Sequence, residues 1–215
     1  MSKRVKEHRA VEIILNIIIV IFAVTGTFLM LTAGSDEGVL EASGIENFKF
    51  YTVLSNVFCG ITALTYLILG LLKRSTDKLV PLKLGAVCSV AVTFAIVAFF
   101  FGPLYGYIQF YRRGNLFFHL LLPVMAMAEF IIVRRKKIPF RHTVIAAVPT
   151  LIYGTCYMLN LLINGVGGPW PYTNDFYAFL SWGWPVGILI FASITLTAFG
   201  FACLFRAVSN KRSRA

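Results

Sequence analysis

Charged residues are scarce in this sequence: they make up 13 % of its 215 residues, and only 9 residues are acidic. A soluble domain carries roughly a quarter charged residues, because its surface must face water. Hydrophobic residues make up 58 % of the chain, which is more than a soluble globule of this size can cover. The lack of charge therefore excludes an ordinary soluble domain and predicts a protein that has lipid as its solvent.

Cysteines are also few, and the four that occur fall in four different apolar runs. They form no C-x-x-C pair, and no histidine lies at ligand spacing from any of them. The sequence therefore predicts neither a disulfide framework nor a metal site. No motif in it implies an organic cofactor.

The formal charge of +11 raises the question of nucleic acid as a partner. The Lys and Arg residues lie in short blocks between apolar runs, rather than along a basic stripe on a soluble module. Basic residues that flank lipid explain such an excess. We therefore expect membrane lipid, and not nucleic acid, as the partner of these charges.

Long apolar runs follow one another along the whole sequence. A bilayer core is about 30 Å thick, so a helix that crosses it needs roughly 20 apolar residues. Six segments meet this length, with short loops between them: about residues 11–32, 48–72, 80–103, 116–133, 140–164 and 181–205. The sequence predicts an all-α bundle of six transmembrane helices that forms a single domain over residues 1–215.

The basic residues divide unequally between the two sides of such a bundle. Of the 20 Lys and Arg residues, 17 fall before the first segment, after the second, after the fourth and after the last; Lys83 and Arg141, at the starts of the third and fifth segments, are counted with these. The other side holds only Lys49, Arg112 and Arg113. Cytoplasmic loops carry the excess of Lys and Arg, so both termini are predicted to be cytoplasmic.

Polar side chains occur where lipid should discourage them, and such positions are frequently functional. Thr52, Ser55 and Asn56 stand at i, i+3 and i+4 of the second segment, so they share one helix face. Thr52 is expected about one turn below the outer surface, as is His119, which is the only histidine within the six segments. The two are thus predicted at the same depth, on helices that run in the same direction.

A threonine hydroxyl and an imidazole at matched depth suggest nucleophilic catalysis, because the ring can take the proton from the hydroxyl. Asn115, one turn before His119, is a candidate to orient the ring. Ser55, Asn56 or a backbone N–H group could donate a hydrogen bond to a developing oxyanion. The alternative is a buried histidine with its bonds satisfied and hydroxyl groups that serve helix packing.

The fifth segment carries a row of polar residues on one face, which is predicted to point into the bundle: Tyr153, Tyr157, Asn160 and Asn164. The row either joins helices by hydrogen bonds or forms the wall of a binding pocket. Trp170, in the loop that follows, is either an interface anchor or part of a lid. Glu129 is expected to pair with Arg134 or Lys136, or to reach water.

Three short motifs resemble those of a known family. These are the residues Phe-Lys-Phe-Tyr-Thr that end at Thr52, His-Leu-Leu-Leu-Pro from His119, and Pro-Trp-Pro-Tyr that ends at Tyr172. They are similar to motifs of the androgen-induced-gene family of six-span intramembrane threonine hydrolases and its bacterial relatives. The resemblance implies Thr52 as nucleophile, His119 as general base, a fatty-acyl ester of a hydroxy fatty acid as substrate, and a bacterial cell membrane as location.

The sequence thus favours an intramembrane hydrolase of lipid esters, with a shallow polar site near the outer leaflet. A transporter or lipid-binding membrane protein is one alternative; it would need a continuous polar path to the cytoplasmic side. A membrane assembly protein without enzymatic activity is the other, in which the polar faces serve packing alone.

Overall fold

The computed structural model describes residues 3–32, 42, 44–133, 135–169 and 172–213. The described chain is all-helical, with one isolated antiparallel bridge between Gly167 and Thr173 and no named strand. Its main helices are α1 (Lys3–Thr32), α2 (Tyr51–Leu71), α3 (Val80–Ile96), α6 (Leu122–Ile132), α7 (Arg141–Asn164) and α8 (Trp184–Arg212).

Short helical turns extend two of these helices. After α3 come the π-helix η3 (Val97–Phe101) and α4 (Gly102–Tyr105), and before α6 come α5 (Arg113–Leu116) and the π-helix η5 (Phe117–Leu121). Two 3₁₀-helices, η1 (Gly44–Lys49) and η2 (Asp77–Leu79), precede α2 and α3, and a third, η4 (Ile108–Phe110), lies between α4 and α5. Counted with these extensions, six described helices are long and apolar enough to cross a membrane.

The six predicted segments are therefore confirmed, with differences at their ends. The first helix begins at Lys3 rather than near residue 11, and the last runs to Arg212 rather than to residue 205. Both extensions are polar. Hydropathy marks the part of a helix that suits hydrocarbon, whereas the backbone ladder continues into water.

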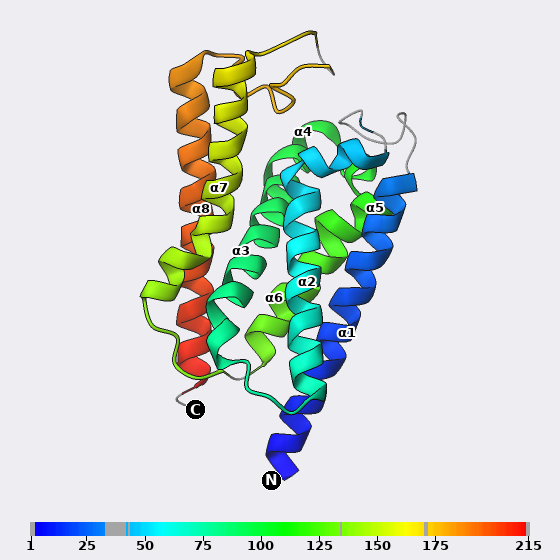
Figure 1. Cartoon of the computed structure of the whole chain (residues 1–215), viewed down its shortest axis with the longest axis vertical. Coiled ribbons are helices and arrows are strands. Elements are labelled where there is room, and N and C mark those ends of the chain that lie inside the picture. Colours follow the sequence, from blue (N-terminus) through cyan, green and yellow to red (C-terminus); the bar gives the residue numbers. More distant parts are fainter. Residues whose placement is uncertain (1–2, 33–41, 43, 134, 170–171, 214–215) are drawn as a thin grey trace.

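Helix α3 lies at the centre of the bundle, in contact with α2, α6, α7 and α8 (Figure 1). Its residues from Lys83 to Thr93 are all buried. Helix α1 packs on α2 and α6 on one side, and α8 packs on α7 and α3 on the other. Large apolar side chains of the outer helices stay exposed, among them Phe28 and Leu196. Such an apolar exterior suits contact with lipid.

The first and last helices have their terminal turns at the same end of the bundle. The first turn of α1 and the last turn of α8 lie at one end of the bundle, at the bottom of Figure 1. Helix η1 and the segment after α7 lie at the opposite end. We call these the terminal end and the η1 end.

Small residues allow close contact between helices. A Cβ atom on Gly60 of α2 would lie 2.4 Å from the Cβ of Ala23 on α1. A Cβ on Gly154 of α7 would lie 1.8 Å from a ring atom of Phe191 on α8. Helices in membranes associate through packing, and small residues let their backbones approach. These glycines are therefore requirements of the packing.

A fully buried group of charges joins three helices near the terminal end. Lys83 Nζ donates a hydrogen bond to Asn16 Oδ1 at 2.7 Å and lies 3.3 Å from Glu129 Oε2. Glu129 Oε1 accepts from Arg135 at 2.8 Å and from Asn16 Nδ2 at 3.2 Å. The Lys83 ammonium also lies 5.0 Å from the ring centroid of Tyr66.

This network corrects two predictions. Glu129 does not pair with Lys136, which instead contacts Asp77 at 2.7 Å on the surface, and it does not reach water. Arg134, the other expected partner, lies outside the described residues. Lys83, counted above with a loop, is a buried residue of α3. A buried carboxylate needs ionic partners, and two cations from different parts of the chain supply them.

Candidate functional site

Thr52 is the second residue of α2, at the η1 end of the bundle. Its side chain is half-buried, and its hydroxyl has no hydrogen bond within the described part of the chain. The first four N–H groups of a helix have no partner inside that helix. The Thr52 N–H is one of these groups, so the residue combines an unbonded hydroxyl with a helix N-terminus.

Asn56 ties the turn that carries Thr52 to the turn that carries His119. Its side-chain amide nitrogen lies 2.7 Å from the carbonyl oxygen of Thr52 and 3.0 Å from that of Phe118, the residue before His119. One buried amide group therefore lies between the two backbones. The bridge shows that the two turns lie close together, while their depth in a membrane stays a prediction.

His119 lies in the π-helix η5, and Pro123 explains why the helix widens there. Proline has no N–H group to donate to the carbonyl of the fourth residue before it, and its ring clashes with that carbonyl. That residue is His119 itself. A wider turn removes the clash, and π-turns of this kind are frequent at functional sites. The ring of His119 is 9 % exposed.

The orientation of the His119 ring is set by a backbone carbonyl. Nδ1 lies 3.0 Å from the carbonyl oxygen of Phe110, and the Phe110 ring packs edge-on at 6.1 Å between centroids. A carbonyl oxygen only accepts, so Nδ1 carries the proton, and the neutral ring presents its lone pair at Nε2. Asn115, the expected orienting residue, is half-buried and makes no described contact with the ring.

Thr52 and His119 are not joined by a hydrogen bond in the described residues. Thr52 Oγ1 and His119 Nε2 each remain without a hydrogen-bond partner there. Catalytic hydrogen bonds are often long in an empty site and shorten when the substrate binds.

The side chains expected to stabilise an oxyanion have their donors in use. Asn56 has two N–H hydrogens, and both are directed at carbonyl oxygens. Ser55 donates its one hydroxyl hydrogen to the carbonyl of Thr52 at 3.1 Å, and its oxygen lies 3.2 Å from the hydroxyl of Thr93. The prediction that either side chain donates to an oxyanion is therefore not supported. Of the expected backbone donors at the start of α2, the Thr52 N–H remains, because the N–H groups of Tyr51, Val53 and Leu54 donate to the Tyr177 hydroxyl and to the Phe50 carbonyl.

The polar row on α7 divides between the core and the surface. Tyr157 is buried and donates to Asp175 Oδ1 at 2.5 Å, and Tyr153 donates to the Lys49 carbonyl at 2.6 Å. Asn160 is half-buried. Asn164 is exposed and donates to Asn160 Oδ1 at 2.7 Å, so the prediction that it faces the interior is wrong. Its place in the last turn of α7, beyond the packed core, is the reason.

The segment after α7 folds back over the start of α2. The Tyr177 hydroxyl accepts a hydrogen bond from the Tyr51 N–H at 2.8 Å. Burial raises the pKa of Tyr177 to about 12, so its hydroxyl stays protonated near neutral pH. Asp175 accepts from the N–H groups of Phe179 and Leu180, both at 2.9 Å. Trp170, predicted to bind or to anchor, lies outside the described residues.

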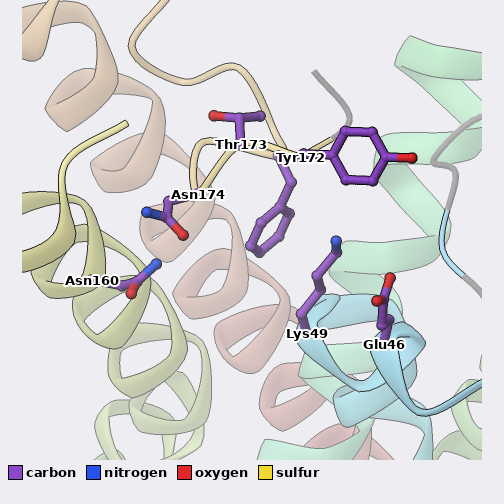
Figure 2. A pocket seen from close by; sticks show the side chains of 7 residues that line it. Glu46, Lys49, Asn160, Tyr172, Thr173 and Asn174 are labelled. Carbon is purple, nitrogen blue, oxygen red and sulfur yellow. The ribbon is translucent and has the colours of Figure 1, made fainter. Parts of the chain in front are cut away.

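A cavity of about 450 Å³ opens at the η1 end, between η1 and this segment. Its lining residues, shown in Figure 2, are Glu46, Lys49, Asn160, Tyr172, Thr173, Asn174 and Phe176. The sequence singled out only Asn160 as a binding residue among these. The sequence placed Lys49 among the three basic residues on the sparsely charged side, but it did not predict a binding role for Lys49 or for Glu46.

These features define the chain as an all-α, multi-pass bundle of the kind compatible with an integral membrane protein. Comparisons with protein-family models, with curated proteins and with solved structures found no match.

Proposed function

We propose that this protein is an intramembrane hydrolase of lipid esters, with Thr52 as nucleophile and His119 as general base. The observation that carries the proposal is the Asn56 bridge, which brings the turns of Thr52 and His119 together. A threonine hydroxyl is a weak nucleophile until a base takes its proton. The unprotonated Nε2 of His119 is such a base.

In the proposed reaction, the Thr52 hydroxyl attacks the ester carbonyl while His119 Nε2 takes its proton. His119 gives that proton to the leaving oxygen, so the alcohol departs and an acyl-enzyme remains. Water then attacks the acyl group while His119 takes its proton. His119 returns this proton to Thr52 Oγ1 as the bond to the acyl group breaks, and the fatty acid is released. The Phe110 carbonyl holds Nδ1–H throughout and stabilises the charged ring. The backbone N–H of Thr52 donates a hydrogen bond to the oxyanion.

The proposal includes a location and an orientation. The unequal distribution of Lys and Arg supports cytoplasmic termini, which places the η1 end at the outer leaflet of the membrane. Long acyl chains can then remain in lipid while the ester reaches the shallow turn that holds Thr52. The motif resemblance supports fatty-acyl esters as substrates and a bacterial cell membrane as location.

A fluorophosphonate probe, which labels activated hydroxyl nucleophiles, tests the proposal on the purified protein. We expect labelling of the wild type, retained labelling of Thr52→Ser, and loss in both Thr52→Ala and His119→Ala. Thr65→Ala is the matched control, since Thr65 is also on α2 and only donates to the Ile61 carbonyl at 2.9 Å. Undiminished labelling of folded Thr52→Ala would exclude Thr52 as the nucleophile.

The charge network at the terminal end favours a second candidate, a transporter. Ionisable residues inside a membrane frequently mark the route of an ion or substrate, and Lys83 and Glu129 are fully buried. Both residues are paired with each other and with Asn16 or Arg135, which is also what a structural role requires. A folded wild type that the probe never labels, but that moves a solute across vesicles, would favour this candidate.

A further inference from the structure

The cavity at the η1 end contains opposite charges that do not neutralise each other. Glu46 and Lys49 are three residues apart in the 3₁₀-helix η1, and a 3₁₀-helix has three residues per turn, so both lie on one face. Both line the cavity (Figure 2). Within the described chain, neither forms an ion pair within 4.0 Å.

The position of Lys49 is fixed from two directions. Its carbonyl accepts the hydrogen bond from Tyr153, which ties η1 to α7. Its ammonium lies 5.4 Å from the ring centroids of Phe50 and Phe176. Rings attract a cation without using its N–H groups, so the ammonium keeps donors for an anion in the cavity.

The wall opposite η1 adds neutral donors. The amide oxygen of Asn160 accepts from Asn164, while its amide N–H groups donate to no other described residue. Figure 2 shows this amide across the cavity from Lys49 and Glu46. On the same wall, the Asn174 amide and the Thr173 hydroxyl already donate to backbone carbonyls. An anion beside Lys49 would therefore meet the uncharged N–H groups of Asn160 on its far side.

We propose that this cavity binds the zwitterionic headgroup of a phospholipid, with the phosphate at Lys49 and Asn160 and the ammonium at Glu46. One cation and one anion on one face match a headgroup that carries one charge of each sign. A purely anionic headgroup would meet the Glu46 carboxylate and be repelled. The volume of about 450 Å³ is within the range of small-molecule sites, roughly 300–1,000 Å³.

The position of the cavity favours a membrane lipid, rather than a soluble molecule, as the source of this headgroup. It lies beside the first turn of α2, at one end of helices that are long enough to cross a membrane. Headgroups occupy the layer beyond the ends of the hydrocarbon-spanning segments. Neither Thr52 nor His119 lines the cavity, so the inference does not depend on the proposed hydrolase.

The test measures binding to the purified full chain in detergent by native mass spectrometry. The probes are dihexanoyl-phosphatidylethanolamine, dihexanoyl-phosphatidylglycerol and free phosphorylethanolamine. We expect the wild type to prefer the ethanolamine lipid over the glycerol lipid by about tenfold, which is about 1.4 kcal/mol. Glu46→Gln should reduce this ratio to near one, and Lys49→Gln should weaken both lipids by about tenfold or more.

Lys137→Gln is the control, because this basic residue lies at the terminal end, after α6. It should leave both affinities unchanged, and a comparable melting temperature confirms that each variant is folded. An unchanged lipid ratio in Glu46→Gln would overturn the proposal, as would an equal loss in the control. Free phosphorylethanolamine that binds as tightly as the lipid would overturn the membrane source. Binding is measured without turnover, so an inactive hydrolase would not affect the result.

Discussion

Replacing Glu129 by glutamine should destabilise the protein more than replacing Lys83 by methionine, although the two residues form one ion pair. Glu129 is within 4.0 Å of both Lys83 and Arg135. Glutamine keeps an oxygen for Asn16 but leaves the two cations without a carboxylate within 4.0 Å among the described residues. Removing one partner of a buried pair costs about 3–5 kcal/mol, and we expect the free energy of unfolding of Glu129→Gln to fall by that amount.

Lys83→Met has a smaller expected effect because Glu129 keeps its contact with Arg135 at 2.8 Å. The substitution leaves Asn16 Oδ1 without its donor, which costs about 1–3 kcal/mol for a buried acceptor. It also removes an ammonium that burial disfavours, and methionine fills a similar volume. The free energy of unfolding of Lys83→Met should therefore fall by about 1 kcal/mol or less.

Unfolding in mixed detergent micelles, followed by circular dichroism, measures both losses. Lys136→Met is the control, since Lys136 pairs with Asp77 at 2.7 Å but is 83 % exposed, and exposed pairs contribute about 0–1 kcal/mol. The double variant should lose less than the sum of the two single losses. A loss in Lys83→Met that equals or exceeds that in Glu129→Gln would refute the reasoning.

Three further predictions concern packing and orientation. Tyr157→Phe removes the buried hydrogen bond to Asp175 and should lower stability by about 1–3 kcal/mol; an unchanged melting temperature would contradict this. Gly60→Leu places its side chain against Ala23 and should cost about 1–3 kcal/mol by overpacking, again seen as a lower melting temperature. A cysteine introduced at Ser213 should resist an impermeant maleimide in intact cells and react after lysis, and labelling before lysis would reverse the proposed orientation.

The six helices were predictable because apolar length is a local property of the sequence. A long apolar run such as residues 141–164 can be recognised from its own residues, without knowing which helices it packs against. The partners of Glu129 were not predictable in this way. Lys83 lies far from it in the sequence, and only the packing of α3 against α6 brings the two together.

The helix faces of the candidate site residues were predictable, but their hydrogen bonds were not. Helical spacing placed Asn56 on the face of Thr52, as found, yet the spacing does not show that its donors are used on two carbonyls. The partner of His119 is a backbone carbonyl of η4, and any residue type can supply one. The family resemblance offered no information about this contact.

The buried network has a consequence for how the chain enters a membrane during synthesis. Helix α3 must insert with Lys83 before α6, which carries Glu129, has been made. Lys83 lies in the first turn of α3, so its long side chain can extend to the interface in the meantime. Helix α1 is already in place and offers Asn16 as a first acceptor. We expect the arrival of Glu129 to draw the ammonium inward, so that α3 completes its packing around this network only after α6 has been made.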